Sequence, residues 1–212
     1  MTGPDDPLEP GLREAAAGDS GAWRALVERH HARLRRMVGL RLDPRLRGRV
    51  DPSDVLQEAY LDAARLLPEY LEAPPLPLFL WLRQLVGTRL AKAHRHHLAT
   101  AARDVRREAG PEPVPAASSV ALVEQLIATS TRPSEEAARQ ELRDRLFSTL
   151  EQMDPLDREV LALRHFEQLT NSEAARTLGL TDGAASKRYV RALERLRNLL
   201  AAEPGLIEGW LA

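Results

Sequence analysis

The sequence predicts an all-α protein made of two small helical domains joined by a flexible linker. Apolar residues recur at steps of three and four in most of the chain, which is the spacing of one helix face. Strand-like alternation and hairpin turn pairs are missing. Between two helical regions, residues 110–133 gather proline, glycine, serine and threonine, a composition typical of linkers. A chain of 212 residues with 43% hydrophobic residues is enough for two small cores.

Composition excludes several classes of protein. The chain has no cysteine, so it has no disulfide framework, thiolate metal site or cysteine nucleophile. No apolar run approaches the roughly 20 residues of a membrane span. The N-terminus is acidic and rich in proline, unlike a signal peptide. We therefore expect no membrane insertion and a cytoplasmic location.

The first domain is expected to cover residues 19–109, after a disordered acidic leader at 1–18. Asp19 or Ser20 is the expected N-cap of its first helix. Apolar positions then continue at helical spacing to Val38, and a break follows at 41–50, where proline and glycine occur.

A second helix is expected to start at Asp51, because an aspartate cap is followed by proline at the first helical position. It should end near Pro68. Three prolines between Ala73 and Pro77 predict a rigid turn, and a long helix should follow from Phe79 to about residue 107. Phe79 and Trp81 in this helix are expected to be core residues.

Past the linker, the second domain is expected to cover residues 134–201. The linker itself contains one apolar patch, Val120 to Ile127, which fits a short helix. Periodicity and caps predict four helices in the second domain, at 134–152, 155–166, 170–178 and 182–201. The last residues, 202–212, form an apolar tail that either packs on this domain, the interpretation we prefer, or offers a regulatory contact.

The clearest motif lies between residues 169 and 182. Thr170 and Glu173 fit a capping box, in which each side chain bonds the backbone amide of the other residue. Gly179 fits the left-handed position that ends a helix. Thr181 or Asp182 then caps the next helix. A short helix, a tight glycine turn and a second helix predict a helix-turn-helix.

The second helix of this motif is strongly basic. Between residues 183 and 197 there is one acidic residue, Glu194, and the basic residues are Lys187, Arg188, Arg191, Arg195 and Arg197. The DNA major groove admits one helix, whose first residues reach base edges while arginine and lysine bind phosphates. An ordinary solvated helix in a bundle is the alternative that this motif alone leaves open.

Charge alternates along the first domain, although the chain as a whole has a formal net charge of -1. Residues 24–49 hold nine arginines and two acids, residues 51–72 six acids and one arginine, and residues 83–107 seven basic residues and one acid. Such blocks suit two different partners, one basic and one acidic. The alternative is that they neutralise each other across helix contacts.

The acidic helix carries a family resemblance. Residues 54–64, DVLQEAYLDAA, resemble the D-L-x-Q-E-x-F-L-x-A-W signature of the extracytoplasmic-function (ECF) group of sigma-70 RNA polymerase initiation factors. Tyr60 stands for the aromatic residue, and Ala64 departs from the usual tryptophan. The FLWLR stretch at 79–83 resembles the following family segment with closer spacing. In the second domain, LDREVL at 156–161, the helix-turn-helix and GAASKR at 183–188 resemble the second conserved region.

This resemblance implies a sigma factor that binds core RNA polymerase and directs initiation at specific promoters, with a region 2-like first domain and a region 4-like second domain. The polymerase partner is the β′ coiled coil, and the residues matching its contacts are Asp54, Gln57, Glu58 and Leu61. The minus-10 element would be contacted by Arg83, Arg89, Lys92, Arg95 and His96. The minus-35 element would be read by Ser186, Lys187, Arg188, Arg191 and Arg195.

Other functions receive less support. A helix-turn-helix regulator that binds DNA without polymerase is the alternative, but no long heptad seam for a dimer is evident. His94, His96 and His97 lack the spacing or the carboxylates of a metal site, and no catalytic motif occurs. We expect no enzyme, no cofactor and no metal. Family members commonly have an anti-sigma factor as a partner and join the nucleoid when bound to polymerase and DNA.

Overall fold

The computed structural model describes residues 9–43, 46, 48–101, 119, 122–123, 126–127 and 136–202, and the regular elements in these ranges are all helices. This confirms the all-α prediction. Two compact units, Met1–Arg107 and Glu108–Ala212, make up the chain and are described separately. Leader residues 1–8, most of the predicted linker, His97 and tail residues 203–212 lie outside the residues or side chains described. None of the described helices is apolar over a stretch long enough to cross a membrane.

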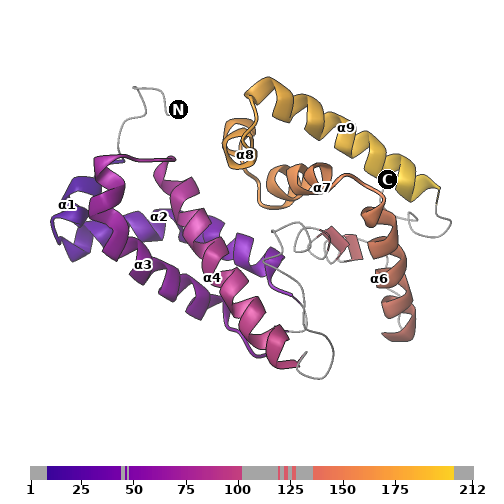
Figure 1. Cartoon of the computed structure of the whole chain (residues 1–212), viewed down its shortest axis with the longest axis horizontal. Helices are drawn as coiled ribbons and strands as arrows, with labels where there is room; N and C mark the ends of the chain where they lie inside the picture. Colours follow the sequence, from indigo (N-terminus) through magenta and orange to yellow (C-terminus); the bar gives the residue numbers. More distant parts are fainter. Residues whose placement is uncertain are drawn as a thin grey trace. The chain divides into compact units, whose positions relative to one another are not determined.

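The helices of the first unit are α1 (Leu12–Ala16), α2 (Ser20–Arg41), α3 (Pro52–Glu72) and α4 (Leu78–Ala101) (Figure 1). The predicted caps are present. The Asp19 carboxylate accepts hydrogen bonds from the amides of Gly21 at 2.8 Å and Ala22 at 3.0 Å. The Asp51 carboxylate accepts from the amide of Ser53 at 2.8 Å. These caps satisfy amides that have no partner inside the helix.

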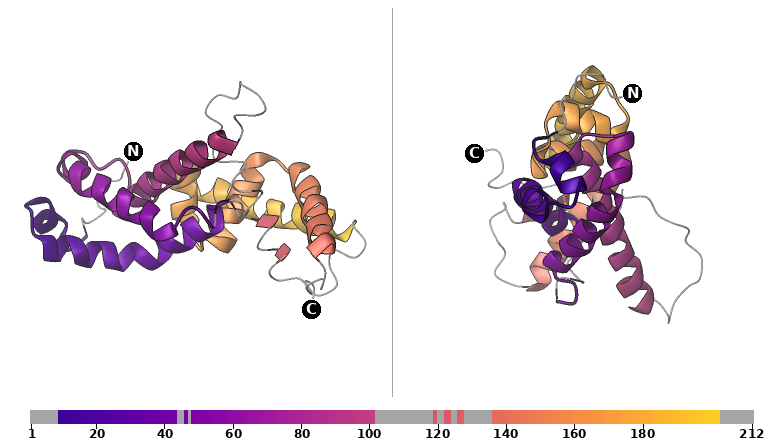
Figure 2. Two further views of the ribbon diagram at one scale, coloured as in Figure 1. Left: turned by 90° about the horizontal axis from the view of Figure 1, so that it is seen from below. Right: turned by 90° about the vertical axis from the view of Figure 1, so that its left-hand side faces the viewer.

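The core of the first unit forms where α2, α3 and α4 contact one another, with α3 and α4 side by side (Figures 1 and 2). Phe79 and Trp81 are 6% and 7% exposed, so the prediction that both belong to the core is confirmed. The Trp81 ring stacks on Tyr70 with the centroids 4.4 Å apart. The Tyr70 hydroxyl donates to the Leu76 carbonyl at 2.9 Å, which helps to anchor α3 beyond Pro68, where we had expected it to end.

The expectation of a disordered leader through residue 18 is wrong for α1. Leu12 and Ala15 are 1% and 9% exposed, and α1 packs against α2 and α3. Just before α1, the Glu9 carboxylate lies 2.9 Å from Arg29 and 3.0 Å from His30 on α2. Five residues are too few for a helical period to show in the sequence, so only the tertiary contacts reveal this element.

The helices of the second unit are α6 (Glu136–Glu151), α7 (Pro155–Leu161), α8 (Asn171–Leu178) and α9 (Asp182–Ala201), with a π-helical turn, η3 (Ala162–Phe166), after α7. The predicted caps of α7, α8 and α9 are present, at Asp154, Thr170 and Thr181. The predicted helix 155–166 thus changes from α to π at Ala162, and the Glu167 amide donates to the Ala162 carbonyl at 2.9 Å.

Part of the predicted linker belongs to the core of the second unit. Leu122, Val123, Leu126 and Ile127 are helical, each less than 9% exposed, and cluster with core residues of α6, α7 and α9. The Ser119 hydroxyl donates to the Glu151 carboxylate at 3.1 Å. Ser119 and these four apolar residues are helical where the structure describes them, and the boundary of the second unit lies before them and not at residue 134.

The helix-turn-helix has the predicted geometry. Thr170 and Glu173 form the capping box, with the Thr170 amide donating to the Glu173 carboxylate at 2.8 Å. Gly179 ends α8 in the left-handed conformation, at φ 65°. The Asn171 side-chain amide donates to the Asp182 carbonyl at 2.8 Å and so fastens α8 to the start of α9. In Figure 1, α8 is seen nearly end-on while α9 runs across the view.

Gly179→Ala should lower the free energy of unfolding by about 1–2 kcal/mol, because an L-residue with a Cβ is strained in the left-handed region. Gly183→Ala is the matched control, since it lies within α9 and a Cβ at either glycine would meet open space. The control should be neutral or stabilising by up to about 1 kcal/mol. Urea unfolding followed by circular dichroism measures both. Equal effects would contradict this role of Gly179.

Candidate partner and nucleic-acid interfaces

One side of α3 presents the four residues that resemble polymerase contacts. Asp54, Gln57, Glu58 and Leu61 are all exposed, and their spacing of three or four residues puts them on one side of the helix. We refer to these four residues as the α3 face. Leu61 is 60% exposed, which is high for an apolar side chain in a unit that has its own hydrophobic core. Two carboxylates around an exposed apolar side chain suit a basic partner with an apolar contact point.

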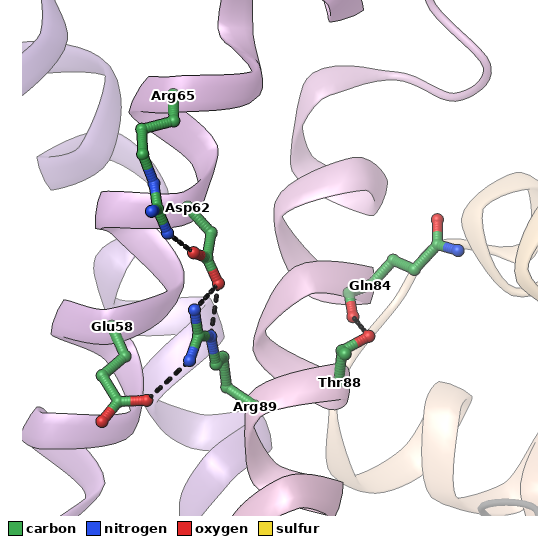
Figure 3. A network of polar contacts seen from close by, with 6 residues as sticks. All are labelled: Glu58, Asp62, Arg65, Gln84, Thr88 and Arg89. Carbon is green, nitrogen blue, oxygen red and sulfur yellow. Dashed lines mark hydrogen bonds and ion pairs between the residues drawn. The ribbon is translucent and has the colours of Figure 1, made fainter.

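An ion-pair network joins the α3 face to α4 (Figure 3). Arg89 on α4 donates to the Glu58 carboxylate at 3.0 Å and also to the Asp62 carboxylate, which Arg65 contacts as well. The sequence had placed Glu58 and Arg89 in two separate binding sites. At this point the acidic and basic blocks neutralise each other, which is the alternative explanation of the charge pattern. All four residues of the α3 face, Glu58 included, are nevertheless exposed.

Two titratable groups of α3 are shifted by their surroundings. The hydrogen bond from Arg89 lowers the pKa of Asp62, and Arg65 lowers it further against an opposing effect of burial. The same Asp62 bond raises the pKa of Arg89. Burial raises the pKa of Tyr60 to about 12, and its hydroxyl lies 3.2 Å from Nδ1 of His31. Tyr60 therefore stays neutral and contacts His31 on α2.

The lowered pKa of Asp62 predicts a specific pH dependence. A carboxyl with a lower pKa in the folded state stabilises it above its unfolded pKa of about 3.9, and this contribution is lost as pH falls through the folded value. The difference in melting temperature between wild type and Asp62→Asn should therefore be constant from pH 5 to 7 and shrink below about pH 4. Thermal unfolding across this range measures it. A difference independent of pH would contradict the role of Asp62.

The basic residues predicted to contact the minus-10 element do not form one surface. Arg83 is only 8% exposed, so its assignment to a phosphate-binding surface is wrong. The reason is helical spacing, since Arg83 lies three and seven residues before Val86 and Leu90, which are buried in the core. Arg89 is held by the acids of α3. Burial of this kind depends on the neighbouring helices and is invisible in a count of charges.

Three of these five residues remain exposed on the second half of α4, namely Lys92, Arg95 and His96. We refer to them as the α4 strip. His94 is separate from the strip, because its Nε2 accepts a hydrogen bond from the Asp43 amide at 3.3 Å. His94 thus anchors the loop after α2.

The five residues of α9 predicted to read the minus-35 element divide into two groups. Ser186, Lys187 and Arg191 are exposed, as the reading helix requires. Val190, which the sequence analysis did not select, is 51% exposed on the same side. Exposed apolar side chains on a reading helix suit the methyl group of thymine. The signal that could have found it is its position four residues after Ser186.

The second group, Arg188 and Arg195, is engaged within the unit. Arg188 Nη1 lies 2.7 Å from one oxygen of Asp157, and Arg195 Nη1 lies 2.9 Å from the other. Arg188 also donates to Asp154 at 3.2 Å. Both arginines were predicted to contact DNA, and Asp157 was not predicted to take part. The structure thus adds an acidic residue of α7 to the basic helix.

The chain is similar to known proteins along most of its length. Residues 149–198 match the Sigma-70, region 4 family. The ECF RNA polymerase sigma factor SigD of Mycobacterium tuberculosis is 29% identical over 202 residues, which are 95% of this chain and 88% of SigD. The RNA polymerase sigma-E factor of Streptomyces coelicolor is 38% identical over 71 residues, 33% of this chain and 40% of that protein.

A solved structure, described as CnrH in complex with the cytosolic domain of CnrY, is similar with a TM-score of 0.53 and 26% identity. The match covers 91% of this chain and 96% of that one. Region 4 coincides with the helix-turn-helix, and the SigD similarity extends through the α3 face. The second unit thus carries the region 4 match, and the chain is similar to ECF sigma factors over nearly its whole length.

Proposed function

We propose that this protein is a sigma factor that binds core RNA polymerase and directs promoter-specific initiation of transcription in the cytoplasm, at the nucleoid. The observation that carries the proposal is the presence, in family order, of an exposed acidic and apolar α3 face and a basic helix-turn-helix. Both act by binding, so the protein is not an enzyme.

Each unit has its own part in this function. The α3 face binds the β′ coiled coil, and the α4 strip follows the phosphates near the minus-10 element. The exposed residues of α9 read the minus-35 element in the major groove. Because polymerase holds both units at one promoter, the second DNA contact is intramolecular, and modest affinities are sufficient.

The solved neighbour contains a second protein, the cytosolic domain of CnrY. We propose that this chain likewise has a protein partner, of the anti-sigma class, that withholds it from polymerase.

Gel filtration of the purified full chain with core RNA polymerase tests the proposal. We expect the chain to elute with the polymerase and to be displaced by an excess of another ECF sigma factor. Separate elution, combined with tight binding to a DNA duplex, would instead support a regulator that works without polymerase.

A further inference from the structure

We propose that Asp157 is a positioning residue that holds Arg188 and Arg195 against α7 and so limits the positive charge that α9 offers to any DNA. This inference rests on the proposed function of α9 as the DNA reader. It explains how a reading helix with five basic residues between positions 183 and 197 can depend on base contacts and not on phosphate attraction alone, which is independent of sequence.

The geometry places one carboxylate between two guanidinium groups. Asp157 lies in the first turn of α7 with its side chain 9% exposed, and each oxygen accepts from a different arginine. Arg188 and Arg195 are seven residues apart, so they project from the same side of α9 two turns apart. A nearly buried carboxylate with both oxygens bonded to cations is far more strongly coupled to them than an exposed pair would be.

Asp154 adds a second acid to this arrangement. Its Oδ1 caps α7 by accepting from the Leu156 amide at 2.8 Å, and the same atom accepts from Arg188 at 3.2 Å. Two arginines thus face two carboxylates, and their charges cancel. The side chains of Arg188 and Arg195 are 34% and 54% exposed. They are therefore bound to the acids of α7 but still lie at the protein surface.

The consequence is a division of labour on α9. Within the described part of the chain, the exposed cations of α9 without an ion pair include Lys187 and Arg191, next to Ser186 and Val190. Removing the Asp157 charge leaves Arg195 without its carboxylate partner and Arg188 with Asp154 alone, so both guanidinium groups bind phosphates more readily and non-specific binding is favoured.

Binding of the full chain to a fluorescent 30-base-pair duplex of random sequence, by anisotropy from 50 to 200 mM salt, tests this inference. Asp157→Asn should bind severalfold more tightly than wild type. The plot of log K against log salt should be steeper by about 0.9 for each additional phosphate contacted. Asp157→Glu should restore the wild-type slope because it restores the charge.

A second variant covers the case in which Asp157→Asn folds poorly. Asp154→Ser keeps an N-cap side chain on a residue that is 51% exposed, and it should shift affinity and slope in the same direction by a smaller amount. Wild-type slopes in both variants, or weaker binding by Asp157→Asn at an unchanged slope, would overturn the inference.

The double variant Lys187→Ala/Arg191→Ala separates this failure from failure of the proposed function. If it weakens duplex binding while the Asp157 and Asp154 variants behave as wild type, α9 reads DNA and only the inference is wrong. If it leaves duplex binding unchanged, α9 is not the reader and the proposed function itself fails.

Discussion

Leu61→Asp is expected to abolish elution with core RNA polymerase while leaving the melting temperature unchanged. Leu61 is 60% exposed, so the folded monomer loses little when it is replaced. In the complex, the same position would bring a carboxylate into an apolar contact between two existing acids of the α3 face. Hot-spot losses of about 2–4 kcal/mol correspond to roughly 30- to 1,000-fold weaker binding.

Leu66→Asp is the matched control, because Leu66 is also an exposed leucine of α3, at 40%. Five residues separate it from Leu61, so it projects from a different side of the helix. Titration of labelled core polymerase with each variant gives the two affinities. Equal losses would mean that the effect does not belong to the α3 face, and wild-type affinity of Leu61→Asp would contradict the assignment.

Lys187→Ala/Arg191→Ala is expected to abolish initiation that depends on the minus-35 element while leaving the affinity for core polymerase intact. Both side chains are exposed on α9, so the change does not disturb the core. Each lost contact to a base or phosphate costs about 1–3 kcal/mol, and together they should reduce promoter-specific transcripts by roughly 100-fold.

Arg197→Ala is the control for this variant, because Arg197 is an exposed arginine nearer the other end of the same helix. Abortive transcription on templates with intact and scrambled minus-35 elements measures the effect. A double variant that retains its preference for the intact element would contradict the assignment of α9.

Arg188 is a poorer test than sequence reasoning alone would suggest. The family motif marks it as a reading residue, yet the structure binds it to Asp154 and Asp157. Arg188→Ala would remove a DNA contact and an internal ion pair at once. Its effect on transcription therefore would not separate the two roles.

Local signals predicted most of the fold, because caps and turns act over three or four residues. Thr170 with Glu173, and Gly179 after them, gave α8 and its turn almost to the residue. What the sequence did not predict depends on distant partners. The helix α1 is stabilised by the burial of Leu12 in the unit in which α1 packs against α2 and α3. Leu122 and Leu126 were predicted to lie in the linker, but they pack in the core of the second unit.

The candidate sites divide in the same way. Helical spacing correctly placed Asp54, Gln57 and Leu61 together on an exposed side of α3. It could not show that Arg83 is buried or that Arg89 is bound to Glu58 and Asp62, since both facts depend on how α4 packs against its neighbours. Asp157 was overlooked because nothing in its local sequence distinguishes it from any acid in the first turn of a helix.

Sequencing of transcript 5′ ends made by purified core RNA polymerase with and without this chain, on genomic DNA of the source cell, is the most direct test of the central claim. We expect a set of start sites that appears only with the chain and shares two upstream elements. Those starts should disappear with Leu61→Asp and with Lys187→Ala/Arg191→Ala. Identical start sites with and without the chain would contradict the assignment of this protein as a sigma factor.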